Sequence, residues 1–111
     1  MRRGEIWLAD LQPTIGAEIS KTRPVVIVSR DSIGILPLKV IVPITDWKIQ
    51  YQTRVWMVRL VPNSVIDLSK TSVADTFQVR SISATRLIRQ LGKLTDLEMQ
   101  VISEALALVL I

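Results

Sequence analysis

A guanidinium, a carboxylate and an ammonium group stand close together in the segment 10–29. Arg23 directly precedes Pro24 at the start of an apolar run, and Glu18 and Lys21 lie in the polar loop before it. Proline pushes the preceding residue into an extended conformation and is tolerated at the first position of a strand or on an edge. Arg23 is therefore held at the mouth of a strand, where its fork of donors matches the oxygens of a phosphate. The alternative is an arginine that only keeps a strand edge soluble.

The residue types that are missing restrict the chemistry. The 111 residues contain neither histidine nor cysteine, which removes disulfides, thiolate metal sites and the usual general base near neutral pH. Any catalysis must use carboxylates, hydroxyls, lysine or arginine. We therefore expect a site without a metal and without a cofactor.

Charge and hydropathy indicate the kinds of partner. The net charge is +4 and the isoelectric point about 10.0, which suits a polyanion, although a basic protein kept soluble has the same balance. The longest apolar run, residues 105–111, is shorter than the roughly 20 residues that span a bilayer. No signal peptide is evident, so we expect a cytoplasmic protein without a membrane contact. A mean hydropathy of +0.36 favours apolar surface covered by a second copy.

Short strands must position these groups. Residues 25–28 form a continuous β-branched run, residues 39–44 repeat that character, and a first strand runs through Trp7. Alternation predicts a further strand over residues 53–60, and residues 72–79, which are mixed in character, are expected as another. Several short strands at close spacing in a small chain favour a barrel or a sandwich.

Two helices are expected after the strands. Residues 83–89 predict a short helix, and Thr95 with Glu98 forms a capping box for a longer one. An apolar stripe follows the box, and we expect it to pack on the strands and to continue into a dimer contact. Its members are Leu97, Val101, Ala105, Leu108 and Val109, widened by Ile102 and Leu106. The predicted fold is one domain over residues 1–111, a small antiparallel SH3-like barrel with a C-terminal helix.

Several segments together resemble the MazF/PemK toxin family. Residues 10–18 read Asp-x-x-Pro-Thr-x-Gly-x-Glu, and residues 23–27 read Arg-Pro-Val-Val-Ile. Residues 40–45 read VIVPIT, residues 68–74 read LSKTSVA, and residues 78–82 read QVRSI, in the order of the family. The resemblance implies a CcdB/PemK-like fold, a homodimer and a cognate antitoxin whose acidic, flexible tail crosses the site.

The resemblance also implies a reaction. Toxins of this family cut single-stranded RNA at short motifs without a metal, leaving a 2′,3′-cyclic phosphate and a 5′-hydroxyl. Metal-dependent nucleases need clustered carboxylates, whereas the ten acidic residues here are scattered singly. Internal transesterification needs a proton acceptor for the 2′-hydroxyl, charge stabilisation on the phosphorane and a proton for the leaving oxygen.

Three residues are the predicted catalytic set. Arg23 matches the family's catalytic arginine and is suited to stabilise the phosphorane, since its pKa above ~12 makes it a poor acid or base. Thr45 matches the catalytic threonine, which positions the phosphate; the alternative is a β-branched residue that closes a strand. Glu18 is the remaining candidate base, and the competing interpretation is that it only pairs with Arg23 or Lys21 and sets the loop.

Polar and aromatic residues around this mouth are the predicted RNA ligands. Phosphates would be neutralised by Lys21, Lys48, Lys70 and Arg80. Base edges would be read by Ser72 and Gln78, and Trp47 would stack on an unpaired base. Each of these has an alternative role on the solvated surface or in the core. Trp7 and Trp56 are expected in the core, since both lie within strand-like runs.

Two departures from the family and two other functions stay open. Residues 19–22 and the Asp75-Thr76-Phe77 stretch differ from the family pattern, which weakens the transfer of base-contact roles. A non-catalytic nucleic-acid-binding barrel would bind RNA in a salt-sensitive way without cleavage. A CcdB-like topoisomerase poison would share the barrel, but its Trp-Gly-Ile tail is missing from a chain that ends Leu-Val-Leu-Ile.

Overall fold

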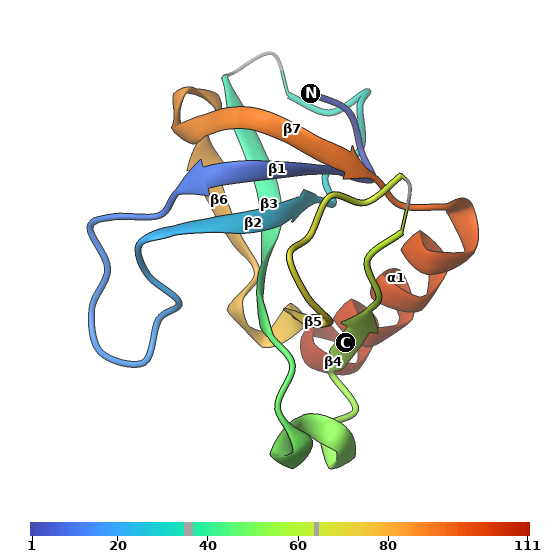
Figure 1. Cartoon of the computed structure of the whole chain (residues 1–111). Helices are drawn as coiled ribbons and strands as arrows, with labels where there is room; N and C mark the ends of the chain where they lie inside the picture. The colour runs from blue at the N-terminus through green and yellow to red at the C-terminus, as the bar shows by residue number, and fades with distance from the viewer. Residues whose placement is uncertain (35–36, 64) are drawn as a thin grey trace.

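The computed structural model describes residues 1–34, 37–63 and 65–111, and shows a curved antiparallel sheet crossed by one helix (Figure 1). The strands are β1 (Glu5–Asp10), β2 (Thr22–Ile27), β3 (Leu38–Asp46), β4 (Met57–Leu60), β5 (Ser72–Asp75), β6 (Arg80–Ser83) and β7 (Leu87–Lys93). The helices are the 3-10 turns η1 (Ile49–Thr53), η2 (Thr76–Gln78) and η3 (Ala84–Arg86), and the α-helix α1 (Asp96–Leu110). The predicted mainly antiparallel β fold with a C-terminal helix is confirmed.

Strand β3 is shared between the two halves of the sheet. The strand order is β4-β5-β3-β2-β1-β7, with β6 also paired to β3. The first part of β3 pairs with β2 and β6, and its last residues pair with β5, where Thr45 lies opposite Val73. The ladder between β2 and β3 ends at the pair Val25–Pro43, because Pro24 and Pro43 have no N–H to donate. Beyond that pair the two strands are free to separate.

Apolar side chains cover both faces of the sheet. One cluster fills the space between the sheet and α1, and it includes Val26, Ile44, Leu60, Leu68 and Ile102. A second cluster lies on the other face and consists of Ala9, Leu11, Val25, Ile27, Ile41, Ile82 and Leu87, with Trp7 and Ile19 packed against it. Alternate residues of β2 thus enter different clusters, as the pleat of a strand requires. Trp7 lies against the core as predicted.

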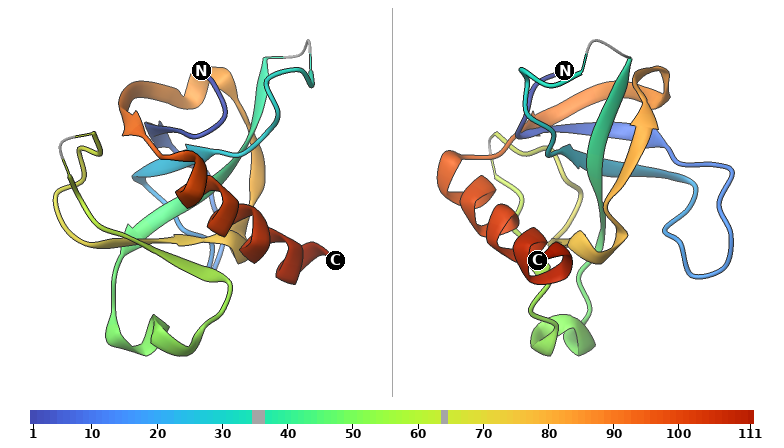
Figure 2. Two further views of the ribbon diagram at one scale, coloured as in Figure 1. Left: turned by 90° about the vertical axis from the view of Figure 1, so that its right-hand side faces the viewer. Right: turned by 180° about the vertical axis from the view of Figure 1, so that it is seen from behind.

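The capping box of α1 is confirmed, but only part of the predicted apolar stripe, including Ile102 and Ala105, faces the sheet. The Thr95 hydroxyl accepts from the Glu98 amide at 3.1 Å, and the Glu98 carboxylate accepts from the Thr95 amide at 2.9 Å. The residues that face the sheet are Met99, Ile102 and Ala105, whereas Leu97, Val101 and Leu108 of the predicted stripe are exposed. The helix carries apolar residues on several sides, so periodicity alone could not select the side that packs. Figure 2 shows α1 crossing the strands. In the part of the chain that the structure describes, no helix has the length and hydropathy needed to cross a membrane.

Three predicted elements are corrected. Residues 53–60 were expected as one strand, but η1 ends at Thr53, a turn follows at residues 55–56, and the strand begins only with β4 at Met57. Residues 72–79 form β5 and η2, and the chain continues into β6. Residues 83–89, expected as a helix, form the end of β6, η3 and the start of β7. The reason is tertiary: β7 forms a long ladder with β1, in which Arg89 lies opposite Leu8, and sheet pairing overrides a weak local helix preference.

Candidate functional site

Arg23 and Thr45 line one cavity of about 340 Å³, here called the Arg23–Thr45 cavity. Its polar lining comes from β2, β3, β5, β7 and the segment 67–69, namely Thr22, Arg23, Thr45, Asp46, Asp67, Ser69, Ser72 and Arg89. Its apolar lining includes Leu8, Ile44, Leu68 and Leu91. The cavity lies where the β2–β3 ladder has ended. Of the predicted site residues, the structure brings together Arg23, Thr45 and Ser72 here.

The guanidinium of Arg23 is held without a complete set of partners. Its Nε atom is buried and has no hydrogen-bond partner among the described residues. The ion pairs found among those residues within 4.0 Å join the N-terminus to Glu5 and Lys70 to Asp46, so none includes Arg23. A buried donor without an acceptor costs about 1–3 kcal/mol. Such a donor in an open cavity is suited to an anionic ligand.

Besides Asp46, two charged residues that line this cavity, Arg89 and Asp67, were not among the predicted site residues. Arg89 lies opposite Leu8 on β1, and Leu8 lies opposite Pro24 on β2, so all three share a face at this cavity. Asp67 is placed by its backbone N–H, which donates to the carbonyl of Leu91 at 2.9 Å. The Arg89 position follows only from the β1–β7 register, and the stretch around residue 89 was expected to be helical. No local pattern marks Asp67.

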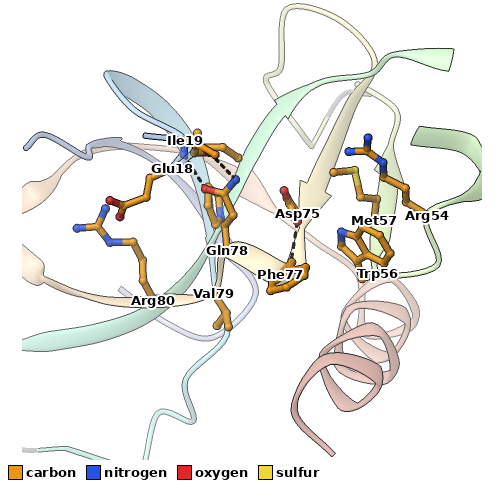
Figure 3. A pocket seen from close by; sticks show the side chains of 12 residues that line it. Glu18, Ile19, Arg54, Trp56, Met57, Asp75, Phe77, Gln78, Val79 and Arg80 are labelled. Carbon is orange, nitrogen blue, oxygen red and sulfur yellow. Dashed lines mark hydrogen bonds between the residues drawn. The ribbon is translucent and has the colours of Figure 1, made fainter. Parts of the chain in front are cut away.

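Glu18, Gln78 and Arg80 line a second cavity of about 440 Å³, here called the Asp75 cavity. Its other lining residues are Ala17, Ile19, Pro43, Arg54, Trp56, Met57, Asp75, Phe77 and Val79. Figure 3 shows Glu18 and Arg80 at one end, Arg54 and Trp56 at the other, and Asp75 between them. Glu18 and Arg23 thus lie in different cavities. The Glu18 carboxylate accepts from the Ile15 amide at 2.8 Å, which stabilises the turn of the loop.

Two of the predicted RNA ligands hold the loop 11–21. The Gln78 side chain accepts from the Ile19 amide at 2.6 Å and donates to the Ala17 carbonyl at 3.2 Å. The Arg80 guanidinium donates to the Leu11 carbonyl at 3.4 Å. Both side chains therefore connect the η2–β6 region to the loop that precedes Arg23. Ser72, which lines the other cavity, is buried and donates to the Lys70 carbonyl at 2.8 Å.

The remaining predicted ligands lie outside both cavities. Lys21 and Lys48 are exposed, and Lys70 pairs with Asp46 at 3.0 Å. The ring of Trp47 is covered by the Arg59 guanidinium, whose carbon lies 4.8 Å from the ring centre. Trp56, predicted to be in the core, is only half-buried and lines the Asp75 cavity instead. It follows a turn rather than lying inside a strand, which is why its burial is incomplete.

Asp75 has an unusual electrostatic environment. Its side chain is 6% exposed, and burial raises its pKa above the ordinary value. The N–H of Phe77, which donates to the carboxylate at 3.1 Å, and the charge of Arg54 act in the opposite direction. Among the described residues there is no group of three or more acidic, histidine or cysteine side chains placed to hold a metal ion.

Comparison with known proteins identifies relatives over almost the full length. The family model described as PemK-like, MazF-like toxin of type II toxin-antitoxin system matches residues 2–110. An "Endoribonuclease MazF9" of Mycobacterium tuberculosis is 34% identical, with 97% of this chain and 94% of the relative covered. An "Endoribonuclease MazF" of Staphylococcus saprophyticus is 33% identical, over 96% of this chain and 88% of the relative.

Solved structures share the fold. A MazF from Deinococcus radiodurans matches with a TM-score of 0.79 and 18% identity, over 99% of this chain and 96% of that chain. A mycobacterial endoribonuclease solved in complex with its cognate antitoxin matches with a TM-score of 0.76 and 22% identity, over 99% of this chain and 94% of that chain. These likenesses confirm the CcdB/PemK-like fold. From the family model and the two relatives, we conclude that the chain belongs to the PemK-like, MazF-like toxins of type II toxin–antitoxin systems.

Proposed function

We propose that this protein is a sequence-specific endoribonuclease that cleaves single-stranded RNA without a metal and acts as the toxin of a toxin–antitoxin pair. The observation that carries the proposal is the Arg23–Thr45 cavity, in which a guanidinium with an unpartnered buried donor and a hydroxyl line one opening. The names of the two relatives, both endoribonucleases, support the reaction class. The products would be a 2′,3′-cyclic phosphate and a 5′-hydroxyl.

The proposed chemistry is an attack of the 2′-oxygen on the adjacent phosphorus. Arg23 stabilises the negative charge of the phosphorane with its fork of donors, and the Thr45 hydroxyl donates to a phosphate oxygen and orients it. Arg89 adds a second positive charge to the same cavity. The P–O5′ bond then breaks, and the leaving oxygen takes up a proton from water.

The proton of the 2′-hydroxyl needs an acceptor. The carboxylates that line the Arg23–Thr45 cavity are Asp46 and Asp67, and Asp46 is paired with Lys70. Asp67 is therefore the better-placed acceptor. Glu18 lines the Asp75 cavity, so it would reach the scissile phosphate only after the loop 11–21 moves. We propose that Glu18 sets the loop.

Two partners complete the proposal. A cognate antitoxin with an acidic, flexible tail would compete with RNA for this basic protein, and one structural neighbour was solved with its cognate antitoxin. A homodimer would cover the exposed apolar face of α1. Simultaneous binding of an acidic peptide and RNA, without mutual exclusion, would contradict the proposed competition by the antitoxin tail.

The test is end-mapping of a long single-stranded RNA incubated with the protein in excess EDTA. We expect discrete cuts with cyclic-phosphate ends, and their loss in Arg23→Ala. Arg30→Ala is the matched control, because Arg30 is exposed and lines neither cavity. Intact RNA with folded wild-type protein would overturn the proposal. Salt-sensitive RNA binding without cleavage would then favour a non-catalytic nucleic-acid-binding module. Inhibition of gyrase would favour a topoisomerase poison.

A further inference from the structure

We propose that the Asp75 cavity receives one unpaired base of the RNA, and that the Asp75 carboxylate selects a base carrying an exocyclic amino group. This inference rests on the proposed function and adds a base preference to it. Asp75 and Phe77 lie in the stretch that departs from the family pattern. The preference would therefore be a property of this chain's own residues.

The first observation is a buried acceptor in an open cavity. Asp75 is 6% exposed, yet it lines a cavity of about 440 Å³. Its Oδ1 atom accepts from the Phe77 amide at 3.1 Å, and the Gln78 side chain adds a weaker hydrogen-bonding contribution. The roughly four lone-pair sites of a carboxylate are therefore only partly used. Among the described residues, no lysine or arginine nitrogen lies within 4.0 Å of it. A buried carboxylate is expensive unless donors surround it, so a ligand that brings donors is favoured here.

The second observation is the aromatic wall of the same cavity. Trp56 and Phe77 meet edge to face, with ring centres 6.0 Å apart and an interplanar angle of 87°. Phe77 is 66% exposed, which is unusual for a large apolar ring without a covering partner. Figure 3 shows both rings beside Asp75. A base that stacks on an aromatic side chain gains about 1–3 kcal/mol.

The third observation is the positive charge at the cavity wall. Arg54 lines the cavity and lies over the Tyr51 ring, 5.0 Å from its centre, so its position is supported from the protein side. The cavity therefore offers a hydrogen-bond donor, the Arg54 guanidinium, together with an acceptor, the Asp75 carboxylate. Adenine, cytosine and guanine present an amino donor together with a ring nitrogen or carbonyl acceptor. Uracil has no amino group, and its single Watson–Crick donor, N3–H, lies between two carbonyl oxygens that a carboxylate repels.

The cavity lies close to the proposed cleavage site. Thr45 pairs with Val73 on β5, and Asp75 follows two residues later on the same strand. Two residues of an extended strand span about 7 Å. Pro43 lines the Asp75 cavity, while Ile44 and Thr45 line the other one. The base that enters would therefore belong to a nucleotide near the scissile phosphate.

The competing interpretation is that Asp75 only caps η2. That role explains its bond to the Phe77 amide, but it does not account for the exposed ring or for the open cavity beside a buried charge. Asp75→Asn separates the two roles, because asparagine keeps an oxygen that can accept from the Phe77 amide. The substitution replaces the second carboxylate oxygen, which would accept from the base, with an amide NH2 group, which can only donate.

The experiment begins with the cleavage motif of the wild-type enzyme. Each amino-bearing base near the cut is then replaced by its analogue without the amino group: purine for adenine, hypoxanthine for guanine, pyrimidin-2-one for cytosine. We expect one position at which the analogue lowers kcat/KM by about tenfold or more. Asp75→Asn should remove that difference while the protein stays folded under the assay conditions, as its unfolding transition will show. Asp31→Asn is the matched control, since Asp31 also accepts a backbone N–H, from Arg3 at 2.7 Å, and lines neither cavity.

The outcomes separate the two proposals. Wild-type enzyme that leaves RNA intact would overturn the proposed function and this inference with it. Cleavage that is indifferent to every analogue would overturn the base preference and leave the nuclease in place. The proposed role of Asp75 would also be overturned if Asp75→Asn discriminates between the bases and their analogues as the wild type does. Asp75 would then be only the cap of η2.

Discussion

At the scale of single residues, the balance between stability and function is most visible at Arg23. Its buried Nε has no partner among the described residues, and an unsatisfied buried donor destabilises a protein. Enzyme sites commonly retain such groups because the missing partner is the ligand. The feature fits the proposed role of Arg23 in holding the phosphate.

The identity of the proton acceptor is a prediction at this scale. We expect Asp67→Asn to lower kcat about 10²–10⁴-fold, because a neutral amide cannot accept the proton. Glu18→Gln should keep most of the wild-type rate, since the amide oxygen can still accept from Ile15. Single-turnover cleavage of a labelled oligonucleotide measures both. The opposite pattern would move the base to Glu18.

A second residue-scale prediction concerns the pH dependence of stability. Burial raises the pKa of Asp75, while the Phe77 amide and the charge of Arg54 partly oppose it. The folded state therefore favours the protonated carboxyl, and its stabilising contribution is complete below the ordinary value of 3.8 and is lost as pH rises through the raised pKa. We expect Asp75→Asn to remove this loss, so its unfolding free energy should vary less between pH 3 and 7. The unfolding free energy is measured by urea titration at several pH values. An equal dependence on pH in Asp75→Asn and in the wild type would contradict the prediction.

At the scale of elements, β7 and the segment 65–68 are packed unusually closely. A Cβ on Gly92 would lie 2.2 Å from the Val65 carbonyl oxygen, and Gly92 has a φ of +156°. Ile66 bridges to Gly92, and Asp67 donates its N–H to Leu91. The glycine thus allows the approach that brings Asp67 to the Arg23–Thr45 cavity.

We expect Gly92→Ala to destabilise the protein by about 1–3 kcal/mol, because the backbone of the 65–68 segment must shift. The shift should also lower cleavage by more than the loss of folded protein explains. Thermal melts and activity at a temperature where both proteins are folded separate the two effects. Lys93→Ala, an exposed neighbour on β7, is the control. An unchanged melting temperature for Gly92→Ala would show that the segment adapts without cost.

At the scale of the whole molecule, apolar surface on α1 remains exposed. Leu97, Val101 and Leu108 are all exposed, and Val101 and Leu108 line a groove with Val55. A large apolar surface of this kind indicates an interaction site. This is the surface to which we assign the proposed homodimer contact.

We expect Leu108→Glu to convert a dimer into a folded monomer, because Leu108 is 65% exposed in one chain and the substitution leaves the core intact. Sedimentation velocity at micromolar concentration gives the mass of the species. Ile33→Glu, at an equally exposed position outside this groove, should leave the mass unchanged. A wild-type monomer, or a dimer that survives Leu108→Glu, would exclude this contact.

The sequence by itself determined the elements whose signals are local. The β-branched runs became β2 and β3, and the Thr95 capping box began α1, because propensity and capping act over a few residues. The family also followed from short motifs, and Arg23 and Thr45 were found because both lie inside them.

Only the tertiary structure decided what depends on pairing between distant strands. Residues 83–89 were wrongly predicted as a helix because the β1–β7 ladder, which no local signal reveals, holds β7 extended. The same ladder places Arg89 at the cavity that Arg23 lines, and the crossing at Gly92 places Asp67 there. Glu18 is close to Arg23 in the sequence but lines a different cavity, because the loop 11–21 is held by Gln78, which is distant from the loop in the sequence. Proximity along the chain is thus a poor guide to which groups share a cavity, since strand register and side-chain tethers set that arrangement.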